Sequence, residues 1–176
     1  NYNTLFSKQD DVDDIRRMDG GGTFNYLLPR DWFLPAAVSF LSNTEQKLDL
    51  RTLATLGAGN YVIHTNHSYW GFAAGVAYNN ERYSDSESKL SWEGYLGSEL
   101  NLYDIGDLNL MTKVVAYPSF TESGRWRLDY ILDTKYDLPL DFYIKIGLTV
   151  NFDNQPVEGA AETDYVLQTG FGWEWE

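Results

Sequence analysis

Apolar and polar residues alternate with a period of two along most of this chain, the spacing typical of strands with two different faces. The clearest segment is residues 142–152. Every second residue, which would share one face of a strand, is apolar: Phe142, Ile144, Ile146, Leu148, Val150 and Phe152. The residues of the other parity, between them, are mostly polar or small. This segment matches the ~9–11 residues that a strand needs to cross a bilayer.

The segment before it, residues 125–136, repeats the alternation with more contrast. Trp126, Leu128 and Leu132 share one face, whereas Arg127, Asp129, Asp133 and Lys135 share the other. A helix would scatter these charges around its circumference, but a strand collects them in one row. The pattern therefore predicts a strand here as well.

Turn-like breaks separate the alternating segments. They fall at residues 10–14, 29–31, 43–46, 64–67, 81–88, 104–107, 122–124, 137–140 and 154–162. These breaks predict ten strands, and an even number of antiparallel strands suits a closed barrel with both ends of the chain on one side. We therefore expect an all-β fold, a ten-stranded antiparallel up-and-down transmembrane β-barrel forming a single domain over residues 1–176. The pattern is weakest at residues 32–42, which are apolar on both parities, and in the second strand, which it places at residues 22–28.

The apolar rows could face lipid, or they could face the interior of a soluble ten-stranded barrel that binds an apolar ligand. Interior volume favours lipid, because a barrel of this size holds only modest side chains or one small ligand, and many of the apolar residues here are aromatic. We predict that the lipid-facing residues include Trp126, Leu128, Leu132, Phe142, Ile144, Ile146, Leu148, Val150 and Phe152. Tryptophan and tyrosine near the ends of the apolar rows, such as Trp70 and Tyr78, would form an aromatic girdle at the two headgroup levels.

The opposite rows combine small residues with charges of both signs. We predict a lumen charge network of Arg51, Glu93, Glu99, Lys113, Arg127, Asp129, Asp133, Lys135 and Lys145. Opposite charges confined in a narrow interior should pair, because an unpaired buried charge is costly.

Composition excludes several classes of protein. The formal net charge of −13 would repel the phosphates of nucleic acid, so no nucleic-acid partner is expected. The absence of cysteine excludes a disulfide framework, a cysteine zinc site and a thiol nucleophile. The sequence contains no run of ~18 apolar residues, so it predicts no transmembrane helix.

Residues with catalytic or metal-binding chemistry are few. His64 and His67 share one predicted turn, but zinc sites need further ligands. Ser68 follows His67, yet a triad requires convergence on an oxyanion pocket, which residue types alone do not indicate. The acidic run at 10–14 lacks the glycine-spaced pattern of a calcium loop. We expect no enzyme activity, no metal site and no cofactor.

Four stretches resemble a bacterial family of unknown function described as salt-induced outer-membrane proteins, domain of unknown function 481. These are NYLLPRDWFL at 25–34, LDLRTLATLGAG at 48–59, YPSFTESGRWRLDY at 117–130 and VNFDNQPVEGAAETDYVLQTGFGWEW at 150–175. The resemblance runs from about residue 15 to the end. It implies an outer-membrane barrel of the Gram-negative envelope, and it supplies no catalytic or binding residue.

The last predicted strand has a second resemblance, to the terminal signal that the barrel assembly machinery recognises. Gln168, Gly170, Trp173 and Trp175 match its polar, glycine, apolar and aromatic positions. The chain departs from the pattern at Glu176, because such signals normally end on the aromatic residue. The resemblance implies the assembly machinery as a partner during biogenesis.

These observations predict a bacterial outer-membrane protein whose partners are outer-membrane lipids and lipopolysaccharide. The first hypothesis for its role is a structural or envelope-stress barrel with a lumen filled by side chains. The alternatives are a narrow channel for ions or small solutes and the soluble ligand-binding barrel. The sequence predicts neither a solute nor an oligomeric state.

Overall fold

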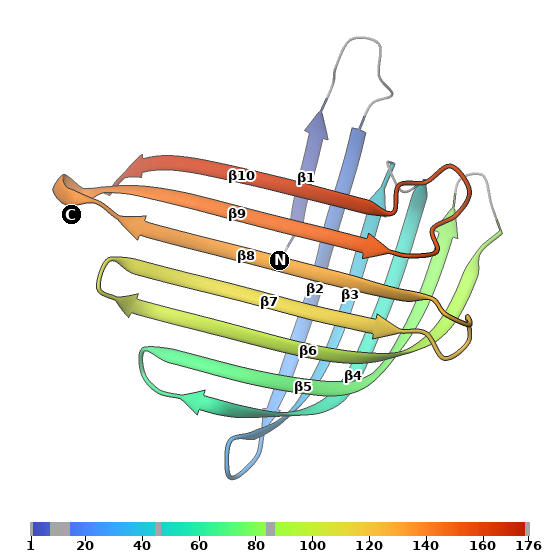
Figure 1. Ribbon diagram of the computed structural model, residues 1–176, viewed down its shortest axis with the longest axis horizontal. Helices are drawn as coiled ribbons and strands as arrows, with labels where there is room; N and C mark the ends of the chain where they lie inside the picture. Colours follow the sequence, from blue (N-terminus) through green and yellow to red (C-terminus); the bar gives the residue numbers. More distant parts are fainter. Residues whose placement is uncertain (1, 8–14, 45–46, 84–86, 175–176) are drawn as a thin grey trace.

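A computed structural model describes residues 2–7, 15–44, 47–83 and 87–174, which form one antiparallel sheet (Figure 1). Each strand lies beside its neighbours in sequence, so the topology is up-and-down. The strands are β1 (Tyr2–Ser7), β2 (Ile15–Leu27), β3 (Trp32–Asn43), β4 (Leu48–His64), β5 (Ser68–Tyr83), β6 (Lys89–Ile105), β7 (Leu108–Pro118), β8 (Trp126–Asp137), β9 (Phe142–Asp153) and β10 (Thr163–Trp173).

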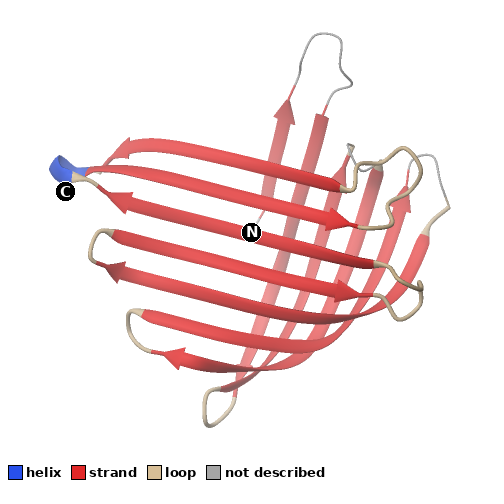
Figure 2. Ribbon diagram, viewed as in Figure 1, coloured by secondary structure: helices blue, strands red, loops and turns tan. Residues whose placement is uncertain are grey.

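The sheet curves around a concave interior as a half-barrel, and a single short 3-10 turn, η1 (Pro139–Asp141), joins β8 to β9 (Figure 2). The prediction of an all-β, antiparallel, up-and-down fold is confirmed in this form. No helix among the described residues is long and apolar enough to cross a membrane.

Several predicted boundaries were wrong by one or two residues, and two were wrong by more. The strand placed at residues 22–28 begins at Ile15, and β5 continues to Tyr83, past the break predicted to begin at Glu81. Three consecutive glycines at 20–22 hide the alternation in β2, but pairing with β3 holds this segment extended. Glu81 was assigned to a loop for its charge, whereas pairing with Arg51 and Lys89 keeps it within the sheet.

The two faces of the sheet have opposite character. Large apolar side chains are exposed on the convex face, where Phe171 is 69% and Leu96 is 60% accessible. Charged side chains are buried on the concave face, where Glu81 is 0% and Arg127 is 1% accessible. Side chains alternate across a pleated strand, so the period-two pattern produces this separation directly.

The middle of the concave face is a small apolar cluster of Leu53, Ala77, Tyr95, Val115 and Tyr117. Gly57 and Gly75 of β4 and β5 make room for the Tyr95 ring from β6. A Cβ atom at Gly57 would lie 2.4 Å from the Tyr95 hydroxyl oxygen. The small residues of β4 and β5 are therefore required by packing inside the sheet.

The sheet curls far enough for its distant strands to meet. A continuous row of paired residues runs from Leu27 in β2 to Asp164 in β10, through Phe33, Gly59, Ala73, Gly97, Val115, Asp129 and Asn151. Asp164, however, forms an ion pair with Arg17, ten residues before Leu27 on β2. The row of paired residues that starts at Leu27 therefore comes back to β2 ten residues away from its starting point. Such a stagger, the shear of the sheet, accompanies strand tilt in barrels.

Candidate functional site

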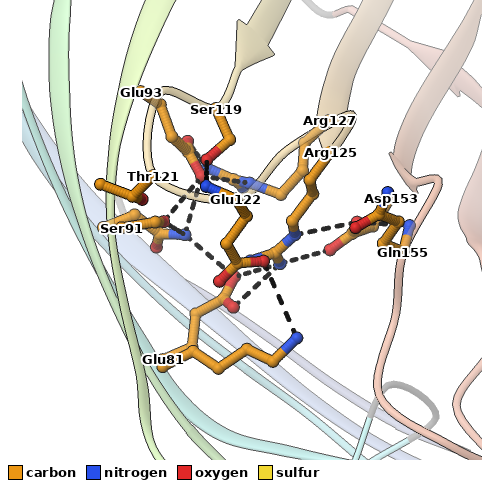
Figure 3. A network of polar contacts seen from close by, with 12 residues as sticks. Glu81, Ser91, Glu93, Ser119, Thr121, Glu122, Arg125, Arg127, Asp153 and Gln155 are labelled. Carbon is orange, nitrogen blue, oxygen red and sulfur yellow. Dashed lines mark hydrogen bonds and ion pairs between the residues drawn. The ribbon is translucent and has the colours of Figure 1, made fainter.

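Among the described residues, the most densely bonded polar site lies on the concave face (Figure 3). It is at the end of the sheet where the connections 119–125 and 154–162 emerge, called here the loop end. The opposite end, with turns at 28–31, 65–67 and 106–107, is called the turn end. Six side chains make up this site, named here the rim cluster. They are Arg51 of β4, Glu81 of β5, Glu93 of β6, Arg125 just before β8, Arg127 of β8 and Asp153 of β9. All of them except Arg51 are labelled in Figure 3.

Glu81 is the centre of the rim cluster. Arg51 Nε donates to its Oε1 at 2.7 Å, and Arg125 Nη2 donates to its Oε2 at 2.9 Å. The Tyr83 hydroxyl also donates to Oε2, at 2.6 Å. A carboxylate with no solvent contact must be compensated in this way, because burial of an unpaired charge is prohibitively costly.

Arg125 bridges β5, β9 and its own loop. Its Nε and Nη2 donate to the two carboxylate oxygens of Asp153, at 3.2 and 2.5 Å, while Nη1 donates to Glu122 at 3.1 Å. Burial alone would lower the pKa of the Arg125 guanidinium, but the hydrogen bond to Asp153 and the charge of Glu81 raise the pKa above its ordinary value. Arg125 is therefore a permanent cation that joins two strands of the sheet to the connection before β8.

Arg127 and Glu93 form the second part of the rim cluster. Arg127 donates through Nε and Nη2 to both oxygens of Glu93, at 3.2 and 2.5 Å. Its guanidinium carbon also lies 4.9 Å from the centre of the Tyr117 ring. Asn79 connects the two parts, because its Nδ2 lies 3.0 Å from Glu81 Oε1 and 3.2 Å from Glu93 Oε1. Two-point pairing of this kind fixes the orientation of both side chains.

The charges of the rim cluster cancel, since three guanidinium groups face three carboxylates. Such an arrangement is costly to desolvate, and removing one partner typically costs about 3–5 kcal/mol because another charge is left uncompensated. The cluster therefore contributes rigidity more than it adds net stability.

A second buried group joins the two sides of the half-barrel. Arg17 of β2 pairs with Asp164 of β10, and its Nη2 donates to Asn151 Oδ1 of β9 at 2.7 Å. Asn43 of β3 also donates to Asp164, at 2.7 Å. All four side chains are at most 9% accessible. This group, named here the seam group, connects β2 and β3 to β9 and β10 without backbone pairing.

The structure divides the predicted lumen network into separate groups. Arg51, Glu93 and Arg127 belong to the rim cluster. Glu99 and Lys113 form their own pair at 3.1 Å, and Lys135 pairs with Asp137 and Glu174 at 2.9 and 2.6 Å. Asp129 accepts from Asn151 Nδ2 at 2.8 Å, and Lys145 lies over the Tyr143 ring. Among the described residues, no ion pair within 4 Å involves Asp133 or Lys145.

Five central residues were absent from the predicted network: Glu81, Arg125, Asp153, Arg17 and Asp164. Glu81 fell within a predicted break and Asp153 lay just beyond the segment predicted at 142–152. Arg125 belonged to the segment predicted at 125–136 but was not included in the network. Their parity was the available signal, because each shares the alternating row of an inward residue, as Arg125 does with Arg127.

All residues predicted to face lipid lie on the convex parity of β8 and β9, with Ile144 and Ile146 the most exposed on β9. On β10, Gln168 and Gly170 share the concave parity, whereas Trp173 is on the convex face, 6.4 Å from the Phe142 ring. Trp175 lies outside the described residues. Near the turn end, His64 Nδ1 is 2.9 Å from Asp31 Oδ1 in an exposed contact.

An antiparallel half-barrel with an apolar convex face and a charged concave face defines a β-barrel-like class of protein. The comparison with protein families identifies the family within this class. The family described as "Protein of unknown function, DUF481" matches residues 1–175, and the chain belongs to it. The predicted family resemblance is thereby confirmed. The comparisons with curated proteins and with solved structures found no match.

Proposed function

We propose that this chain is an integral barrel of the bacterial outer membrane with a structural role and an interior closed to solute flux. The observation that carries the proposal is the inverted polarity of the sheet, with Leu56 60% exposed outside and Glu93 1% exposed inside. A water-soluble monomer rarely exposes so extensive an apolar surface. A lipid environment accounts for that surface, and lipids are the natural partners of the convex face.

The seam group supports closure into a complete ten-stranded barrel. Arg17 and Asp164 come from strands on opposite sides of the sheet, and their pairing returns the row of paired residues to β2. No backbone pairing joins β1 to β10 within the described residues. In a bilayer an unpaired strand edge is expensive, so lipid should favour completion of this last ladder.

The rim cluster supports the absence of flux. It brings side chains from β4, β5, β6, β8 and β9 together at one end of the interior, and every acidic and basic group in it is less than a tenth exposed. If the two ends of the chain face the periplasm, this closed end faces outward. Its acidic loops would then lie among the lipopolysaccharide headgroups.

The experiment that tests this role is conductance in planar bilayers. We expect no sustained single-channel current from the unaltered protein at neutral pH. Combined Arg125→Ala and Arg127→Ala substitutions should produce discrete current steps, because they remove the two cations that hold Glu81, Glu93 and Asp153 together.

The matched control for this experiment is Lys135→Ala, which alters an ion pair outside the rim cluster and should leave the bilayer silent. Steady conductance from the unaltered protein would replace the structural role with that of a channel.

A separate prediction concerns biogenesis. We propose that Trp173 and Trp175 belong to the signal recognised by the assembly machinery. Replacing both with alanine should reduce the assembled protein in cells severalfold, while folding of the purified protein into detergent slows little. Equal losses in the two assays would mean that the tryptophans act only through packing, as Trp173 does against Phe142.

A further inference from the structure

Beyond the rim cluster, the concave face lines a partly open cavity of about 610 Å³ that extends toward the turn end. Residues from β2 to β10 line it. The rim cluster limits the cavity at the loop end, where Arg127 forms part of its lining. Its size lies within the range of about 300–1,000 Å³ that small-molecule sites occupy.

One wall of this cavity is aromatic. Phe33 of β3 and Tyr61 of β4 stack with ring centres 4.4 Å apart. Tyr69 of β5 meets Tyr61 edge-on at 5.5 Å. All three residues line the cavity. Stacked and edge-on rings from three strands offer several aromatic faces, which carry partial negative charge.

Another part of the lining carries carboxylates. Asp129 and Asp133 of β8 line the same cavity, and Asp133 lies in one row of paired residues with Tyr69, through Asn101 and Met111. Among the described residues, no cation lies within ion-pairing distance of either aspartate: Arg127 pairs with Glu93, and Lys113 pairs with Glu99. The neutral Asn151 amide is the partner of Asp129.

A further aromatic residue, Tyr95, also lines the cavity and is 7% exposed. Its hydroxyl is buried against Gly57 of β4, so the ring and not the hydroxyl borders the cavity. The floor of the cavity is therefore aromatic as well.

From these features we infer that the turn-end half of the interior binds a small organic cation, of the quaternary ammonium class. Aromatic faces attract such cations through the ring quadrupole, and the interaction strengthens where water is excluded. Asp129 and Asp133 supply the countercharge. Such binding requires the interior alone, whatever surrounds the convex face.

Choline is a suitable test compound, because 3,3-dimethylbutan-1-ol has the same shape without the charge. Ligand-observed NMR titrations of the folded protein in a nonionic detergent would compare the two. We expect saturable binding of choline and none of the neutral analogue. Asp129→Asn together with Asp133→Asn should weaken choline binding by about tenfold, which corresponds to about 1.4 kcal/mol.

Two further variants separate a direct role from a change in fold. Tyr69→Leu should also weaken choline binding, whereas Asp107→Asn in the turn between β6 and β7 should leave it unchanged. Far-ultraviolet circular dichroism would establish that each variant retains its sheet. Absence of choline binding, equal binding of the neutral analogue, or unchanged affinity in the double aspartate variant would overturn the inference.

Discussion

Replacement of Arg125 by methionine should lower the free energy of unfolding by about 3–5 kcal/mol, the usual consequence of removing one partner from a buried ion pair. Arg125 has a fully buried side chain, and its loss leaves Glu81 and Asp153 with one guanidinium fewer. Equilibrium unfolding in guanidinium chloride from detergent micelles, followed by tryptophan fluorescence, would measure the change.

Arg82→Met is the matched control, because the same substitution then falls on an exposed residue of β5 and should change stability by less than about 0.5 kcal/mol. Adding Glu81→Gln to Arg125→Met should restore part of the lost stability by removing the uncompensated charge. If Arg125→Met and Arg82→Met were equally mild, the rim cluster would not be the buried unit described above.

The second large effect should appear on the convex face of β9. Ile146→Arg should disfavour insertion into lipid by about 2–4 kcal/mol, the typical cost of arginine on the lipid face near the bilayer centre. Ile146 is 41% exposed on the apolar row of its strand. Folding titrations into phospholipid vesicles would measure the difference from the unaltered protein.

Thr149→Arg provides the comparison on the same strand, since Thr149 lines the interior cavity, where water and Asp129 can accommodate a cation. Its cost should be clearly smaller than that of Ile146→Arg. A cost of equal size for both arginines would show that the two faces of β9 do not meet different environments.

Strands with uninterrupted alternation could be predicted almost to the residue. The segment predicted at 142–152 is β9 at Phe142–Asp153, and the break predicted at 154–162 ends where β10 begins at Thr163. In both strands the residues of the two faces differ strongly in polarity, and the long polar connection between the strands marks where they end. In β2 the three glycines carry no side-chain signal, so only pairing with β3 defines where that strand begins.

The rim cluster was predictable only in part, because its pairs depend on curvature and register. Parity places Arg127 and Glu93 inside, but it does not pair Arg125 with Glu81, 44 residues earlier in the chain. Likewise, nothing local connects Arg17 with Asp164, which are 147 residues apart. Contacts of this kind follow from the stagger of the whole sheet, which a strand-by-strand pattern does not specify.

The central claim is that the convex face contacts lipid, and the absence of native cysteine allows a direct measurement. Single cysteines introduced along residues 142–152 would carry nitroxide labels, and electron paramagnetic resonance would record their accessibility to oxygen and to a water-soluble nickel chelate in lipid vesicles. We expect residues on the parity of Ile144, Ile146 and Leu148 to be accessible to oxygen and protected from nickel, and the alternate residues to lose that preference. Nickel accessibility on the Ile146 parity, or no alternation along the strand, would contradict the account.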